Sequence, residues 1–409
     1  NIFAGDGGNI FLAPGSLIDV SGYEVLDKKA ADKVMSVQMN SLEMRDEFLQ
    51  KNQENGIYQG KKVYFLTHKG VGIGNVSEHL ANRPRSVKEW NTDGGAITLL
   101  ADWGGFDQHL IDRDQGSIIA GTGAKLDVSG GRIHYAKGYV QTTVLKANGI
   151  ASAIDSAPDW LTLDAMINVN DVKNPHHKTW LPAHDEGGDA GTLKLTAADI
   201  VYEGQMDGSV TRGLFQVNLS ESLDDLLYPK TVGTVIPRAG KLIIGNPDSG
   251  PYSDIDAVTQ AIVIKDKTPG HTAFSLPENR RGETWLSDDL LSGAGLGSIE
   301  MHALGSVVIE PNTRLSLSAG GDLTVTARRV LHHGDIEVPA GSVSLTARSN
   351  KTSGKTQLAD PDAPNLNFNP ENEKKWRLDD EKVLLAKASR ISTAGEHHNA
   401  YTAQRTATG

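Results

Sequence analysis

The chain has 409 residues, of which 38% are hydrophobic, 6% are aromatic and 44 are glycine, a composition that favours turns and thin strands over one large globular core. Its formal net charge is −11 with both signs dispersed, so it lacks the basic stripe that neutralises nucleic-acid phosphates, and we expect no DNA or RNA partner. The absence of cysteine excludes disulfides, thiolate metal sites and thiol nucleophiles.

Hydrophobic runs along the chain are short. None approaches the roughly 18 residues that a membrane helix needs, so we expect no membrane insertion. Residues 1–4 (NIFA) have neither the basic start nor the apolar stretch of a signal peptide. We therefore expect the chain to be an internal part of a longer protein.

The first segment is repeated about one hundred residues later. Residues 7–22 read GGNIFLAPGSLIDVSG, and residues 116–130 read GSIIAGTGAKLDVSG. Both end in Asp-Val-Ser-Gly, which begins at Asp19 and again at Asp127. Glycine accepts backbone angles that other residues resist, so the sequence predicts the same tight corner at both places.

An excursion over about residues 23–92 separates these two copies. Within it, residues 36–49 carry loosely spaced apolar residues after Ser41, which could cap a short helix. Residues 62–67 (KVYFLT) predict a strand.

A seven-residue phrase, Gly-polar-apolar-polar-apolar-polar-Ala, recurs along the chain. Its copies are residues 95–101, 191–197, 297–303, 321–327 and 341–347, with a looser copy at 240–245. Side chains alternate between the two faces of a strand, so Leu193 should point inward while Lys194 faces water. The spacing of 24 residues from Ile299 to Leu323, and of 20 from Leu323 to Val343, suits one coil of a stacked solenoid.

A single strand of this kind cannot bury its apolar face. Stacking at about 4.8 Å per step would place each aliphatic side chain on its counterpart in the next coil. The sequence therefore predicts an all-β fold, a right-handed parallel β-helix (solenoid) with protruding loops and short helices.

The expected organisation alternates coils with projecting segments. Coils are predicted over 1–146 (apart from the excursion), 190–269, 296–349 and a terminal coil at 385–409; an extended decorated loop over 147–189, an excursion with a short helix over 270–295, and a polar loop or arm over 350–384.

With these motifs the chain resembles the filamentous haemagglutinin-like large exoproteins, the secreted partners of two-partner secretion. The resemblance covers most of the chain. It is carried by the opening repeat and corners described above and by residues 40–45 (NSLEMR), 187–197 (GGDAGTLKLTA), 290–295 (LLSGAG) and 334–347 (GDIEVPAGSVSLTA). The resemblance implies a secreted, surface-exposed β-helical shaft that mediates adhesion, biofilm or matrix formation.

The resemblance also implies partners. These are an outer-membrane β-barrel transporter during export, then a host or bacterial surface glycan or protein, and further copies of the chain in filaments. The amino-terminal secretion domain of the family, with its Asn-Pro-Asn-type signature, is not visible in this sequence. Contact with the transporter is therefore assigned to no residue.

Potential metal ligands are densest at His176, His177, His184, Asp185 and Glu186. Imidazole and carboxylate together could hold zinc if the loop folded back on itself. The segment lacks the helical two-histidine spacing of a metalloprotease, so we favour a solvated loop and expect no metal and no cofactor.

Enzymatic activity is the main alternative, because parallel β-helices also carry polysaccharide lyases and glycoside hydrolases. Asp102, Asp112 and Asp114, or Asp199 and Glu203, could pair across coils as acid and base. No nucleophile elbow, phosphate loop or paired-carboxylate motif accompanies them, so we expect a non-enzymatic protein. A second alternative is the stalk of a contact-dependent toxin delivery protein.

Aromatic residues in the projecting segments could form a contact surface for sugars or proteins. They are Trp103, Phe106, Trp160, Trp180 and Trp285. The competing interpretation, which we favour, is that each ring is buried and fastens its loop to the shaft.

Overall fold

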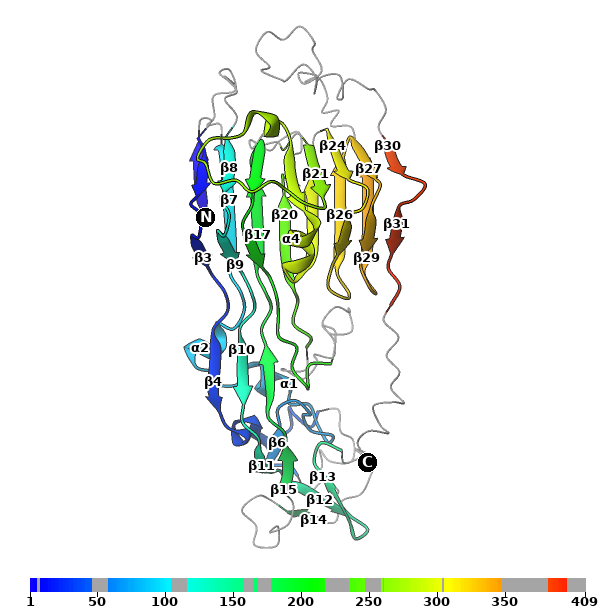
Figure 1. Cartoon of the computed structure of the whole chain (residues 1–409). Coiled ribbons are helices and arrows are strands. Elements are labelled where there is room, and N and C mark those ends of the chain that lie inside the picture. The colour runs from blue at the N-terminus through cyan, green and yellow to red at the C-terminus, as the bar shows by residue number, and fades with distance from the viewer. Residues whose placement is uncertain are drawn as a thin grey trace.

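The computed structural model describes the chain over residues 1–5, 8–45, 58–103, 116–156, 165–167, 178–217, 235–246, 259, 261–303, 305–347 and 382–395, and all structural statements refer to these residues. They form mostly strands, with few and short helices, so the protein is all-β. Its two largest sheets consist of parallel strands (Figure 1).

The first large sheet has seven strands, in the order β1-β7-β17-β20-β23-β26-β29. Their bounds are β1 Ile2–Gly5, β7 Ala96–Trp103, β17 Thr192–Thr196, β20 Gly240–Ile244, β23 Leu296–His302, β26 Asp322–Ala327 and β29 Ser342–Ala347. All six copies of the predicted phrase are strands of this sheet, so the strand predictions are confirmed. Every pairing in it is parallel.

Inward-facing residues of this sheet lie in register from strand to strand. Leu193 is the Cα partner of Ile97 on one side and of Leu242 on the other. The same line continues through Ile299 and Leu323, and all five side chains are buried. Burying one such side chain stabilises a fold by about 1.5–3 kcal/mol, so this column is a main part of the core.

The second large sheet has eight strands, in the order β2-β8-β18-β22-β21-β24-β27-β30. Their bounds are β2 Ile10–Leu12, β8 Ser117–Ala120, β18 Asp199–Tyr202, β21 Ala261–Lys265, β22 Thr284–Ser287, β24 Ser306–Ile309, β27 Arg329–His332 and β30 Lys382–Leu385. Strand β22 follows β21 in the sequence but lies between β18 and β21. The intervening residues 266–283 therefore leave the sheet and return to it.

Two smaller parallel sheets complete this part of the molecule. They are β3-β9-β19 (Leu17–Asp19, Lys125–Asp127 and Gln205–Asp207) and β25-β28-β31 (Arg314–Ser316, Asp335–Glu337 and Arg390–Ser392). Near the amino terminus the chain takes one strand from each of three sheets in turn: β1, β2 and β3, then β7, β8 and β9, then β17, β18 and β19. Segments about one hundred residues apart in sequence thus lie side by side (Figure 1).

Helix α4 (Asp288–Gly293) contacts both β19 and β25. Ser287 caps its first turn by accepting a hydrogen bond from Leu290 N at 3.1 Å. The Asp288 carboxylate accepts from Arg314 N at 2.6 Å, so a helical side chain satisfies a backbone donor of β25. This is the short helix expected within the excursion over 270–295, and it begins after Trp285, which belongs to β22.

A second group of smaller sheets lies below the large ones in Figure 1. Their strands are β4 Glu24–Lys28, β10 Arg132–Tyr135 and β16 His184–Gly187; β5 Val34–Met39 and β6 Lys61–Leu66; β11 Gly138–Gln141 and β15 Lys178–Leu181; and β12 Val144–Ala147, β13 Ile150–Ala153 and β14 Ala165–Ile167. Most of their pairings are antiparallel. The helices η1 Ala30–Lys33, α1 Ser77–Ala81 and α2 Val87–Trp90 accompany them. We call these elements the antiparallel region; they have their own core, which includes Met39, Phe65 and Leu145.

Two expectations change in this region. Residues 34–39 form β5, which pairs with the correctly predicted strand β6. The short helix that Ser41 could cap is not formed over residues 41–45, which are a turn. Residues 46–49 lie outside the described residues. Strands β10 to β12, inside the range expected to form coils, belong to the antiparallel region because each of them pairs antiparallel with a strand from residues 150–187.

The glycines of the Asp-Val-Ser-Gly corners are needed for a different reason from the one predicted. Gly22 and Gly130 are not among the glycines with positive φ. A Cβ at Gly130 would lie 2.2 Å from Gly188 O, and one at Gly22 would lie 1.9 Å from Thr92 O. The close approach of neighbouring backbones, not an unusual dihedral angle, requires glycine here.

Among the helices of the described residues, none combines the length and the apolar character needed to cross a membrane.

Candidate interaction surface

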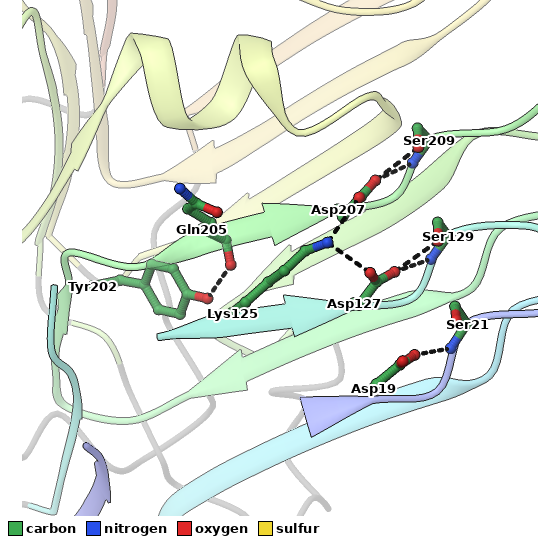
Figure 2. Close-up of polar contacts among 9 residues, drawn as sticks. All are labelled: Asp19, Ser21, Lys125, Asp127, Ser129, Tyr202, Gln205, Asp207 and Ser209. Atoms are coloured by element: carbon green, nitrogen blue, oxygen red, sulfur yellow. Dashed lines mark hydrogen bonds and ion pairs between the residues drawn. The ribbon is translucent and has the colours of Figure 1, made fainter. Parts of the chain in front are cut away.

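The two Asp-Val-Ser-Gly corners and a third corner at Asp207 form a ladder at the ends of β3, β9 and β19 (Figure 2). Asp19, Asp127 and Asp207 are successive Cα partners in this sheet. Each carboxylate accepts a hydrogen bond from the backbone N–H two residues later, at 2.9, 3.0 and 3.2 Å respectively. This is the local turn that aspartate side chains favour. Sequence reasoning found two of the rungs but missed Asp207, because its corner reads Asp-Gly-Ser-Val.

One lysine ties two rungs together. Lys125 Nζ lies 2.7 Å from Oδ2 of Asp127 and 3.1 Å from Oδ2 of Asp207. Hydrogen bonding to Asp127 raises the pKa of Lys125. Burial acts to raise the pKa of Asp127, but hydrogen bonds from Lys125 and Ser129 outweigh it and lower that pKa. The carboxylates of these two rungs are therefore engaged within the chain, and the ladder acts as a structural corner.

Two of the carboxylates considered for catalysis are also engaged within the chain. Asp199 is buried at the start of β18, accepts a hydrogen bond from Gly282 N at 2.5 Å, and has its pKa raised to about 6 by burial. Glu203 accepts from Thr268 Oγ1 at 2.7 Å and from Arg280 Nη1 at 3.2 Å. Both carboxylates thus fasten the 266–283 excursion to β18. The side chain of Asp102 and all of Asp112 and Asp114 lie outside the described residues.

Trp285 also contacts side chains of the 266–283 excursion. Its Nε1 donates to Glu283 Oε2 at 2.9 Å, and its ring lies 4.3 Å from Lys265 Nζ and 4.6 Å from the guanidinium of Arg280. Two cations this close to one ring stabilise the packing around it and occupy part of the surface that a ligand would use. At this position the geometry favours a fastening role over a contact surface.

Trp180 lies in a different environment, on β15 of the antiparallel region. Its ring packs edge-on against Tyr139 of β11, with centroids 4.8 Å apart, and the two residues are 49% and 66% exposed. The alternate residues Val140 and Leu181 are buried, so the pair lies on the outward face of this two-stranded sheet. Aromatic pairs with exposed faces can stack on sugar rings or fill a pocket of a protein partner.

Within the described residues, the structure shows no contact between this pair and the other three predicted aromatic residues. Trp103 ends β7, where its backbone pairs with Gly5, and its side chain lies outside the described residues, as do Phe106 and Trp160. Sequence reasoning missed Tyr139, although the alternation of residues 138–141 (GYVQ) could have marked it as the outward residue of a short strand.

The histidine and acid cluster is divided between two faces of β16. His184 is buried against Tyr135, with ring centroids 5.1 Å apart, and burial lowers its pKa. Asp185 points to the other face, 2.7 Å from His134 Nδ1. His176 and His177 lie outside the described residues. Within the part of the chain that the structure describes, no three His, Asp or Glu side chains gather as metal ligands.

Glu186, the last member of that cluster, pairs with a lysine that sequence reasoning did not consider. Lys33 Nζ contacts Glu186 Oε1 in the interior of the antiparallel region. Arg83 Nη2 lies 3.9 Å from Oε2 of the same carboxylate. The pair could not be found from the sequence, because its members are 153 residues apart.

The sequence matches no family model, and searches for similar curated proteins and for similar solved structures also found no match. What the geometry defines is a class: an all-β protein whose main sheets are parallel, with an antiparallel region that carries an exposed aromatic pair.

Proposed function

We propose that the parallel sheets are the faces of a right-handed parallel β-helix, and that the chain is part of the shaft of a secreted, cell-surface exoprotein of the filamentous haemagglutinin-like kind. Its role is structural and non-enzymatic: adhesion, biofilm or matrix formation. The observation that carries this proposal is the register of Ile97, Leu193, Leu242, Ile299 and Leu323 on five neighbouring parallel strands. A chain that returns to the same sheet at each turn of a solenoid would give such a line from residues so far apart.

The shaft holds the antiparallel region as an interaction surface. A stiff shaft presents this surface away from the cell, and weak contacts repeated over many copies sum to avidity. The exposed pair Tyr139 and Trp180 is the contact that we assign, and its partner is a surface glycan or protein. Export uses an outer-membrane transporter that binds a region outside this chain, and copies of the shaft associate into filaments.

The non-enzymatic role is supported by the contacts of Asp199 and Glu203. An acid and base pair must face a substrate, with its carboxylates positioned on either side of the reacting bond. These two instead bind Gly282 N and the Arg280 side chain of their own chain.

Cell-binding and glycan-array measurements on the purified chain test the interaction surface. Replacing Trp180 by alanine should reduce binding at least severalfold while leaving the circular dichroism spectrum and melting temperature unchanged. Tyr23→Ala is the matched control, because Tyr23 is a similarly exposed aromatic outside the pair. Equal binding by wild type and Trp180→Ala, or turnover of a polysaccharide by the wild type, would refute the assignment.

A further inference from the structure

Lys33 and Glu186 form the most deeply buried ion pair among the described residues. Lys33 ends η1 and Glu186 lies on β16, and their exposed fractions are 0% and 5%. Nζ of the lysine contacts Oε1 of the carboxylate directly. Because both side chains are buried, bulk water does not come between the ammonium group and the carboxylate.

Three other side chains surround this contact. The Tyr135 ring centroid lies 4.8 Å from Lys33 Nζ, and the Tyr135 hydroxyl is hydrogen-bonded to Glu186. Arg83 faces the second carboxylate oxygen at 3.9 Å. The ring of His184 stacks on Tyr135, and its Nδ1 lies 3.0 Å from Pro182 O.

These surroundings favour a reactive amine. Burial lowers the pKa of Lys33; Glu186 acts to raise it, and the guanidinium groups of Arg83 and Arg85 lower it further. Desolvation and a neighbouring cation both lower the pKa of a lysine, and the neutral amine that they favour is the nucleophilic form. Burial also raises the pKa of Tyr135, so its hydroxyl keeps the proton that it donates to the carboxyl group.

We propose that Lys33 and Glu186 condense into an intramolecular amide bond that cross-links η1 to β16. One proton of the Lys33 ammonium group first passes to the carboxylate, which gives a neutral amine and a carboxylic acid. The Nζ lone pair then attacks Cδ of Glu186 and forms the N–C bond, and the C–O bond to the protonated oxygen breaks. The leaving hydroxyl takes a second proton from Nζ and departs as one water molecule, so no oxidant or cofactor is required. The Tyr135 hydroxyl relays a proton to the leaving oxygen, and Arg83 stabilises negative charge on the other oxygen.

The amide bond would stabilise this chain as a covalent cross-link, in the way that a disulfide stabilises other proteins. The sequence has no cysteine, so disulfides are excluded. A cross-link between residues 153 positions apart closes a very long loop and restricts the unfolded chain. It also fixes the antiparallel region against pulling forces, since η1 can no longer separate from β16.

Intact-mass spectrometry of the denatured wild-type chain tests the proposal. We expect a mass below that of the sequence by one water molecule, and a branched tryptic peptide that joins the segments around Lys33 and Glu186. The variant Lys33→Arg keeps the positive charge but should have the full mass of its sequence and yield only linear peptides. Because the wild-type measurement is made on unfolded protein, it decides the question even if the variant does not fold.

Lys125 is the matched control. It also contacts two carboxylates, those of Asp127 and Asp207, but it is partly exposed. Lys125→Arg should retain the loss of one water, and peptides containing Lys125 should be linear in the wild type. A wild-type chain with the full sequence mass and a linear Lys33 peptide would overturn the cross-link, and would leave the proposed shaft and its binding surface untouched.

Discussion

Ile97 and Leu193 are Cα partners on the neighbouring parallel strands β7 and β17, although 96 residues separate them in the sequence. Both side chains are buried in the same cluster. The pair shows how the protein makes a core with few aromatic residues: each aliphatic side chain is covered by its counterpart on the next strand.

Leu193→Ala should lower the free energy of unfolding by about 2–5 kcal/mol, because it leaves a cavity in a fully buried column. Urea denaturation followed by circular dichroism measures this change. Lys194→Ala, on the same strand but on its outer face, should change stability by less than about 0.5 kcal/mol. Equal effects of the two substitutions would contradict the inward and outward assignment.

Gly130→Ala should destabilise the fold, because its Cβ would meet the carbonyl oxygen of Gly188 at 2.2 Å and the backbones of two strands would have to separate. Gly293→Ala is the control: no atom lies within 4 Å of a Cβ there, and alanine favours the helix α4 by about 0.5–1 kcal/mol. Thermal unfolding of both variants should therefore shift in opposite directions. A melting temperature of Gly130→Ala equal to that of the wild type would show that the corner is looser than described.

Both the six strand phrases and the inward direction of Leu193 could be predicted from the sequence, because alternation of apolar and polar residues is a local property of a strand. The partner of a strand is not a local property. The position of β22 between β18 and β21, and the antiparallel pairing of β10 with β16, depend on contacts between residues far apart in the sequence.

The same reason explains what was missed in the candidate sites. The sequence marks Asp199, Glu203 and Trp285 as candidate residues. Their contacts with Gly282 and Arg280 of the 266–283 excursion could not be predicted from it. The exposed ring of Tyr139 was overlooked, because only its pairing with Trp180 gives it significance.

Asp199 should make stability depend on pH near 6. Its folded pKa is raised to about 6, so the neutral carboxyl group is the form that the fold prefers. The resulting stability is fully present below the unfolded pKa of about 4 and is lost as the pH rises through about 6. Asp199→Asn keeps an oxygen that can accept from Gly282 N, and should exceed the stability of the wild type by up to about 3 kcal/mol at pH 8.

At pH 3.5 this difference should largely disappear, since the wild-type carboxyl group is then protonated. Urea denaturation at the two pH values measures both differences. An advantage of Asp199→Asn that stays constant with pH would contradict the raised pKa.

Glu203→Gln should have the opposite sign from Asp199→Asn at neutral pH. Removing this carboxylate leaves the buried guanidinium of Arg280 without its counter-charge, which costs about 3–5 kcal/mol. Limited proteolysis should then cut the 266–283 excursion faster than in the wild type. Unchanged proteolysis and unchanged stability would show that the ion pair does not fasten the excursion.

Asp127 gives a pH dependence in the acidic range. Its folded pKa is lowered below the ordinary value, so the stability it provides is present above the unfolded pKa of about 4 and is lost as the pH falls through the folded value. Asp127→Asn should be less stable than the wild type at pH 7 and should lose less on acidification. Asp19→Asn, whose carboxylate accepts only from Ser21 among the contacts described at this corner, should show a smaller loss at pH 7.

The stacking of strands is tested most directly by a distance between spin labels, which the absence of native cysteine makes straightforward. Thr98 and Thr324 lie on the outer face of the seven-stranded sheet, on β7 and β26, four strand steps apart. Labels on Thr98→Cys and Thr324→Cys should give one narrow distance of about 19 Å, since each step is about 4.8 Å. A broad distribution, or one centred at more than twice that length, would contradict the continuous parallel sheet.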